Sequence, residues 1–123
     1  MTPHFCISPE PAFDLIIIEM SGFFEPADIE RFEAARNAAH RKLTSKPNEH
    51  FTLVDIRGML IQSQEAVERF RNILMNPTYT SKRIAIVVSK TLARMQIQRA
   101  AAGRDVKFFT DDTAAARAWL LGD

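Results

Sequence analysis

Residues 83–88 read Arg83-Ile84-Ala85-Ile86-Val87-Val88, with five consecutive apolar side chains. A strand with water on one face alternates apolar and polar residues, whereas a strand covered on both faces is apolar almost throughout. We therefore predict a central strand here, inside a mostly parallel sheet. Successive parallel strands need a crossover between them, usually a helix, so helices are expected on both sides of this segment.

Four further segments are short and rich in β-branched or aromatic residues, and they predict the remaining strands at residues 5–7, 13–20, 51–56 and 105–109. Pro9 and Pro11 lie between the first two segments and indicate a turn. The first two strands should therefore form an antiparallel hairpin at one end of the sheet.

Helices are predicted after each of the later strands. Pro26 fits the first position of the first helix, because its missing N–H would have no partner there anyway. Ser63 and Ser89 are suited to cap the second and third helices, and Thr110 or Asp111 the fourth. Apolar spacings of three and four define the inner faces, which in the last helix are expected to be Ala115, Ala118, Trp119 and Leu121.

The predicted order is therefore β-β-α-β-α-β-α-β-α. It predicts an α/β fold with a mixed, mostly parallel sheet of about five strands, an N-terminal antiparallel hairpin, four helices and right-handed crossovers. The chain has 123 residues, 46% of them hydrophobic, and a net charge of +1. We expect a single domain over residues 1–123 and, since there is no strong basic excess, no nucleic-acid partner.

Cys6 is the only cysteine, so no internal disulfide is possible, as is typical of a reducing compartment. Its place on a predicted strand indicates a small buried thiol. The N-terminal residues carry no basic leader, and no apolar run approaches the roughly 20 residues that cross a bilayer. We expect a cytoplasmic protein without membrane insertion.

The four glycines form neither a GxGxxG nor a GxxxxGK[ST] pattern, so these nucleotide-binding loops are excluded and no cofactor is predicted. His4, His40 and His50 lie far apart, without a cysteine cluster or a helical pair. We interpret them as surface histidines and predict no metal site. Asp111 and Asp112 are explained by helix capping, so no catalytic site is predicted and the protein is not expected to be an enzyme.

Five polar residues lie at the carboxyl ends of the predicted strands or at the helix starts that follow them: Asp55, Arg57, Ser63, Ser89 and Lys90. Ligands of open α/β sheets bind at this edge, and helix N–H groups can hold a phosphate there. These residues are candidates for a phosphoacceptor or for a site that binds a small anionic or apolar ligand. Purely structural roles, such as loop hydrogen bonds and caps, are the alternative.

The third helix offers a candidate interaction patch. Leu92, Met95 and Arg99 share one face, and the face around Ile97 is the better core face. An apolar patch bordered by arginine is a plausible contact surface for a protein partner or for a second copy of the chain. A wide core stripe is the alternative that the pattern slightly favours.

From about residue 13 to residue 121, the chain resembles the SpoIIAA-like proteins, which are related to the STAS domain and are sometimes described as STAS/SEC14-type. The resemblance rests on residues 53–58, 83–88, 93–96, 106–109 and 118–120 and on the order of the elements. It implies a bacterial, non-enzymatic regulatory or protein-interaction module similar to anti-sigma-factor antagonists, with a homodimer as a candidate assembly.

Regulated members of that broader fold carry a phosphorylatable serine where a helix begins, in an Asp-Ser-Ser/Thr-Gly context. Here Asp55 and Ser63 fall at about the corresponding places, but the Asp-Ser pair and the glycine after it are absent. The resemblance therefore implies Ser63 as a candidate phosphoacceptor.

Overall fold

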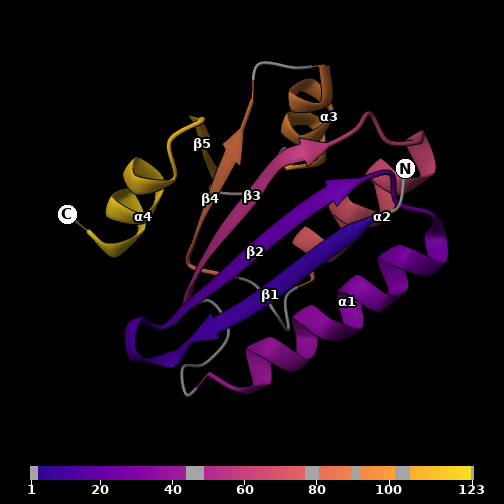
Figure 1. Cartoon of the computed structure of the whole chain (residues 1–123). Helices are drawn as coiled ribbons and strands as arrows, with labels where there is room; N and C mark the ends of the chain where they lie inside the picture. The colour runs from indigo at the N-terminus through magenta and orange to yellow at the C-terminus, as the bar shows by residue number, and fades with distance from the viewer. Residues whose placement is uncertain (1–2, 44–48, 77–80, 90–91, 102–105, 123) are drawn as a thin grey trace.

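The computed structural model describes residues 3–43, 49–76, 81–89, 92–101 and 106–122 (Figure 1). Its elements follow the predicted order: β1 (His4–Glu10), a 3-10 turn (Pro11–Phe13), β2 (Leu15–Gly22), α1 (Pro26–Arg41), β3 (Phe51–Met59), α2 (Gln64–Leu74), β4 (Arg83–Val88), α3 (Leu92–Ala100), β5 (Val106–Thr110) and α4 (Thr113–Leu121). The α/β class and the N-terminal hairpin are confirmed.

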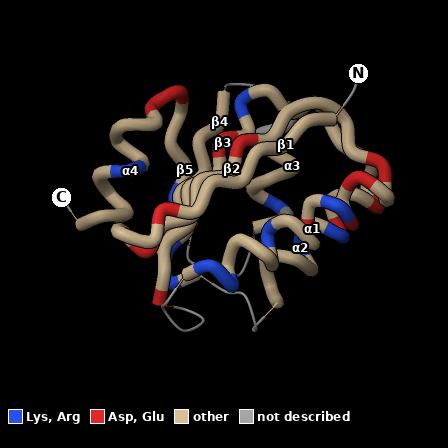
Figure 2. Tube along the Cα trace, turned by 60° about the horizontal axis from the view of Figure 1, so that its bottom comes forward, with Lys and Arg blue, Asp and Glu red and all other residues tan. Residues whose placement is uncertain are grey.

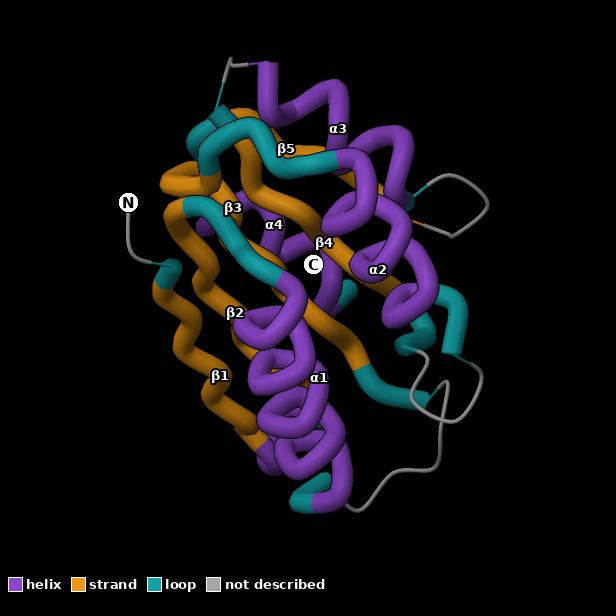
Figure 3. The backbone as a smooth tube through the Cα atoms, turned by 90° about the vertical axis from the view of Figure 1, so that its right-hand side faces the viewer, coloured by secondary structure: helices purple, strands orange, loops and turns teal. Residues whose placement is uncertain are grey.

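The five strands lie in the order β1-β2-β3-β4-β5, with β1 antiparallel to β2 and the other neighbours parallel. Each crossover moves one strand further in the same direction, so right-handed connections place α1, α2 and α3 on one face of the sheet. The helix α4 follows the last strand and packs on the other face, as Figure 3 shows, where α1 and α2 lie in front of the strands and α4 behind them.

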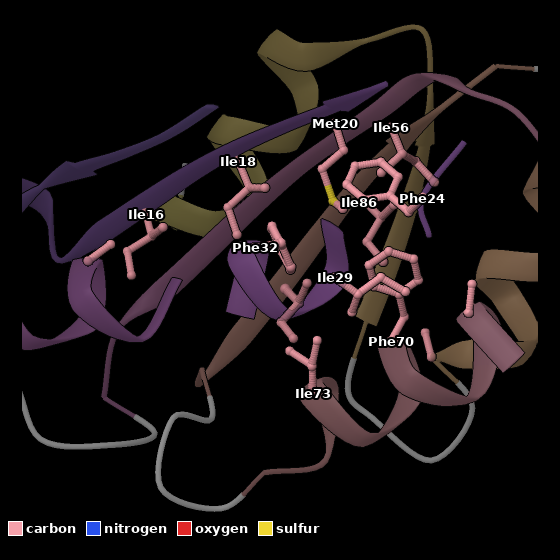
Figure 4. Packing of buried hydrophobic residues seen from close by; sticks show 14 of the residues in the cluster. Ile16, Ile18, Met20, Phe24, Ile29, Phe32, Ile56, Phe70, Ile73 and Ile86 are labelled. Atoms are coloured by element: carbon pink, nitrogen blue, oxygen red, sulfur yellow. The ribbon is translucent and has the colours of Figure 1, made fainter. Parts of the chain in front are cut away.

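The larger core lies between the sheet and α1, α2 and α3. Inward side chains of β2, among them Ile18 and Met20, face phenylalanines of the helices (Figure 4). Phe32 of α1 and Phe70 of α2 meet edge to face, with ring centroids 6.1 Å apart. Phe24, which is 1% exposed, packs against Phe70 in the same way at 5.7 Å. Such edge-to-face pairs add to the stability that burial provides.

The smaller core lies under α4 and contains Leu53 and Val87 from the sheet and Ala116 and Leu120 from the helix. The predicted inner face missed the two buried residues, Ala116 and Leu120, although Trp119, which it included, packs against this core. Alanines occupy several faces of α4, so they gave the pattern no direction. Trp119 is only half-buried because its ring lies at the edge of the core, where the guanidinium of Arg83 is 5.4 Å from its centre.

The predicted cap of α4 is also corrected. Asp112 caps the helix, since its Oδ1 accepts from the N–H of Ala115 at 2.9 Å. Asp111 takes the left-handed φ of 52° in the turn before it and donates its N–H to the carbonyl of Val88. Because of this turn, the cap of α4 lies one residue after Asp111.

Cys6 is exposed, which contradicts the buried thiol predicted for it. Along β1, Phe5 and Ile7 face the larger core, whereas Cys6 and its alternating neighbours point to the other face. The main contacts of α4 are with β3, β4 and β5. Its Arg117 also pairs with Glu10 at the end of β1, at 3.1 Å, but Cys6 stays exposed. Figure 2 shows acidic and basic residues mixed along α1 rather than separated.

Candidate functional site

An acid and an arginine form a pair at the carboxyl end of β3. Arg57 donates from Nε to one oxygen of Asp55 at 3.0 Å and from Nη2 to the other at 2.7 Å. Nη2 also lies 3.3 Å from the hydroxyl of Thr113 at the start of α4. The hydrogen bond from Arg57 holds the pKa of Asp55 below its usual value, and the same bond raises the pKa of Arg57.

Ser63 lies on the other side of the sheet from this pair. It is the N-cap of α2, with its hydroxyl accepting from the N–H of Ala66 at 3.1 Å, and its side chain is exposed. The Asp55–Arg57 pair instead faces α4. The five predicted edge residues therefore do not form one cluster. Ser89 is half-buried after β4, and Lys90 lies outside the described residues.

The third-helix patch is partly as expected. Met95 is 59% exposed and Arg99 is exposed four residues later, while Ile97 packs against the larger core. The side chain of Leu92 lies outside the described residues. The helix α3 is described from Leu92, and residues 90–91 before it are not described, so neither the predicted start of this helix nor the cap proposed for Ser89 is tested.

Two apolar side chains that the sequence analysis missed lie in the loop after β3. Leu60 is 44% exposed and Ile61 is 51% exposed. We call Leu60, Ile61 and Met95 the loop–α3 patch, because a pair of glutamines holds this loop against α3. The sequence signal for these exposed side chains is a run of two large apolar residues between a predicted strand and a predicted helix cap.

These glutamines are Gln62 and Gln96. Gln96 accepts from the backbone N–H of Gln62 at 2.6 Å and donates to its carbonyl at 2.7 Å. The side chain of Gln62, only 7% exposed, donates to the carbonyls of Gly22 and Leu60 and accepts from the N–H of Phe24. One buried amide therefore joins the segments that follow β2 and β3, and its backbone is bonded to α3.

A cavity of about 70 Å³ lies beside the larger core and is lined by residues of the sheet and of the three helices on that face. Its walls are apolar except for Arg36, His40, Thr52 and Ser81. A smaller pocket of about 30 Å³ lies under the loop–α3 patch and includes Leu60, Gln62 and Gln96. Ile56, Met59, Phe70 and Ile97 line both spaces.

The polar wall of the cavity belongs to a buried hydrogen-bonded cluster. The hydroxyl of Ser81 lies 2.5 Å from the hydroxyl of Thr52 and 2.9 Å from Nε2 of His50. The ring of His40, from the last turn of α1, stands edge-on to that of His50 at 4.4 Å. Since Ser81 is 4% exposed, these contacts join the starts of β3 and β4.

The prediction of surface histidines is therefore wrong for two of the three, because His50 is 2% exposed and His40 is half-buried. Burial, the neighbouring His50 and the charge of Arg36 lower the pKa of His40 to about 3. Burial also lowers the pKa of His50, although the carboxylate of Asp14 acts in the opposite direction. Both rings are neutral near pH 7.

The family model described as SpoIIAA-like matches residues 15–121 of the chain. The chain belongs to the SpoIIAA-like family. The fold and the resemblance predicted from sequence are thereby confirmed. No curated protein matches the sequence.

Two solved structures share the SpoIIAA-like fold of this protein. An uncharacterised protein with a SpoIIAA-like fold from Shewanella loihica PV-4 is 21% identical, with a TM-score of 0.73, and the match covers 98% of this chain and 96% of that one. An anti-sigma factor antagonist from Mycobacterium paratuberculosis is 10% identical, with a TM-score of 0.61 and coverage of 97% and 94%. At these identities the likeness concerns the fold.

Two further observations concern metal-binding groups and membrane-spanning helices. Within the described ranges, no three His, Cys, Asp or Glu side chains are grouped so that they could hold a metal ion. In the same part of the chain, none of the helices combines the length and apolar character that crossing a membrane requires.

Proposed function

We propose that this SpoIIAA-like protein is a regulatory module without catalytic activity that acts by binding a partner protein through the loop–α3 patch. The proposal rests on the exposure of three large apolar side chains, Leu60, Ile61 and Met95, which are between 44% and 59% exposed. They lie on two segments that the contact of Gln62 with Gln96 joins. Apolar surface grouped in this way favours a protein contact. The fold likeness to an anti-sigma factor antagonist supports a regulatory role.

Hydrogen bonds join the two segments that carry the patch. Ile61 precedes Gln62 and Met95 precedes Gln96, and these two glutamines are bonded to each other twice. A surface that is already held in one conformation loses little conformational entropy when a partner binds. The glutamine pair therefore supports a preformed contact surface.

The chemistry of the partner follows from the border of the patch. Arg99 is exposed one helical turn after Met95. A partner that places an apolar side chain on Ile61 and Met95 and an acidic residue near Arg99 would match both features. A second copy of the chain is the other candidate occupant.

Regulation of this contact is proposed at Ser63, which is exposed two residues after Ile61. A phosphate at the N-cap would lie among N–H groups of α2 and add negative charge beside the patch.

A second candidate is a site for a small ligand on the side of the sheet that α4 covers. It would use the pair of Asp55 and Arg57, with Ser89 and Lys90.

The test is quantitative affinity purification with three forms of the full chain: wild type, a patch variant carrying Ile61→Asp and Met95→Asp, and Phe13→Asp. Phe13 is a matched control because it is also an exposed apolar residue, at 52%, but lies in the turn between β1 and β2. Proteins retained by the wild type and the control but lost by the patch variant would support the proposal. Equal recovery by all three forms would contradict it.

A further inference from the structure

The strand β1 forms one border of the sheet (Figure 3). It runs over seven residues, His4–Glu10, and β2 is its neighbour in the described part of the chain. The backbone N–H and C=O groups on the outer side of a border strand can pair with a further strand. The outer side of β1 is therefore a template on which another strand can add.

A hydrogen bond at the start of β2 shows which of its backbone groups point toward β1. Phe51 donates its N–H to the carbonyl of Asp14 at 2.8 Å, so the backbone groups of Asp14 point toward β3. Along a strand between two neighbours, the backbone groups of successive residues point to opposite sides. Those of Leu15, Ile17 and Glu19 therefore point toward β1.

The register of the hairpin then gives the outward groups of β1. The three residues of β1 that lie opposite and point toward β2 are Glu10, Ser8 and Cys6. The backbone groups of the alternating residues Phe5, Ile7 and Pro9 therefore point outward. Proline has no N–H to donate, and a strand tolerates it where this side faces away from the sheet. The place of Pro9 agrees with this assignment.

The outward residues of β1 carry apolar side chains that suit a second copy of the same strand. With two copies antiparallel and Ile7 opposite Ile7, each Phe5 lies opposite Pro9 of the other copy. Phe5 and Ile7 are half-buried against the larger core, where Phe5 meets Phe32 edge to face at 5.6 Å. The pairing would bury more of these side chains, which is favourable.

The other side of β1 is polar and fits the same pairing. Cys6 and Ser8 are both exposed, and each would lie opposite the other across the two copies. His4 would lie opposite Glu10, so an imidazole faces a carboxylate. Arg117 of the same chain holds Glu10 in place at 3.1 Å. The pairing therefore opposes no like charges along β1.

We propose that two copies of this chain associate through β1, antiparallel about a two-fold axis at Ile7, so that their sheets form one continuous sheet. The two Ile7 residues exchange two hydrogen bonds, and each Phe5 donates one to the carbonyl of Pro9 in the other copy. The border strand β5 is less suited, because it has five residues and exposes Lys107. A lysine on an edge strand resists such pairing. The association is separate from the loop–α3 patch and from the partner proposed there.

Disulfide trapping tests the register. Cys6 of one copy would face Ser8 of the other in a pair without backbone hydrogen bonds, with Cα atoms about 4.5 Å apart. The two Cys6 residues would be diagonal neighbours about 7–8 Å apart, beyond the reach of a disulfide. Under mild oxidation, wild type mixed with Cys6→Ser/Ser8→Cys should therefore give a covalent heterodimer, and neither protein alone should give a covalent dimer.

The control for random collision is wild type mixed with Cys6→Ser/Phe13→Cys. This variant carries its thiol at an exposed position outside β1. Trapping no more efficient than in this control would overturn the proposal. Trapping of wild type with itself as efficient as in the mixture would do so as well, because it would place Cys6 opposite Cys6.

Sedimentation equilibrium tests the association without a disulfide. Ile7→Pro removes one outward N–H from each copy and should weaken dimerisation about tenfold or more, whereas Ile7→Val keeps the N–H and is the matched control. Pro9 shows that an outward position of β1 accepts proline, and thermal unfolding checks that Ile7→Pro is folded. The variant Ile61→Asp/Met95→Asp should dimerise like the wild type. A wild type that is monomeric at millimolar concentration, equal dissociation constants for the two Ile7 variants, or loss of the dimer in the patch variant would overturn the proposal.

Discussion

The side-chain amide of Gln96 bonds to both backbone groups of Gln62, at 2.6 Å to its N–H and 2.7 Å to its carbonyl. This pair is 34 residues apart in sequence and fixes the loop after β3 against α3. The two hydrogen bonds therefore join the two segments that carry the loop–α3 patch.

Replacing Gln62 by leucine should destabilise the protein strongly. The change would leave the N–H of Phe24 and the carbonyl of Gly22 buried without their present partner. Each such buried group costs about 1–3 kcal/mol, so we expect a loss of about 2–4 kcal/mol in the free energy of unfolding. Urea unfolding measures this loss.

The control for this prediction is Gln98→Leu on the exposed side of α3. Exposed substitutions of this kind usually change stability by less than about 0.5 kcal/mol. Similar losses for both variants would show that the contacts of Gln62 are not responsible.

Ser63 should stabilise the protein because its side chain caps α2, so another side chain with an acceptor at this position should serve as well. Ser63→Ala removes the acceptor for the N–H of Ala66 and should cost about 1 kcal/mol. Ser63→Asp keeps an acceptor at the N-cap and should retain most of the stability. Thermal unfolding of the two variants distinguishes them, and equal destabilisation by both would argue against the cap.

The buried histidines predict that the protein becomes less stable in acid. Both His40 and His50 have pKa values lowered from 6.5 in the folded state, that of His40 to about 3. Below pH 6.5 the unfolded chain therefore binds more protons than the folded one. The stability contributed by the neutral rings is complete above pH 6.5 and is lost as the pH falls from there toward 3.

Urea unfolding at a series of pH values from 8 to 4 measures this loss. His40→Gln should flatten the curve in the range below pH 6.5, because one of the two histidines no longer titrates. A wild-type stability that is constant or rises on acidification in this range would contradict the burial of the two rings.

Gly58 should tolerate no side chain where it passes β2. A Cβ atom at this position would lie 2.8 Å from the Cβ of Ser21, at the irregularity between β2 and β3. Gly58→Ala should therefore cost about 1–3 kcal/mol. Ser21→Gly should recover much of this loss in the double variant, and a double-mutant cycle by urea unfolding measures the coupling. Additive effects would mean that the two positions do not collide.

Much of the fold could be predicted because it depends on local signals. The apolar run of β4, the proline at the start of α1 and the serine at the start of α2 each act within a few residues. The faces of α4 were not predictable in this way, since alanine fits an inner and an outer position equally well. The exposure of Cys6 could not be predicted without knowing which strands α4 covers.

The candidate site was predictable only in part. Met95 and Arg99 could be assigned to one helical face from their spacing. The contact of Gln62 with Gln96, and that of His40 with His50, arises only when the crossovers bring separate elements together. The periodicity of a single segment carries no information about such contacts.

Above all, we expect a partner protein to bind at the loop–α3 patch. The most direct test is the dissociation constant of the purified partner, measured by calorimetry with the wild type, Ile61→Asp/Met95→Asp and Phe13→Asp. Sedimentation of the same proteins covers the case in which the partner is a second copy. We predict at least about a hundredfold weaker binding by the patch variant, as expected for loss of about 3 kcal/mol at a central apolar contact, and an unchanged constant for the control. An unchanged constant for a folded patch variant would contradict the claim.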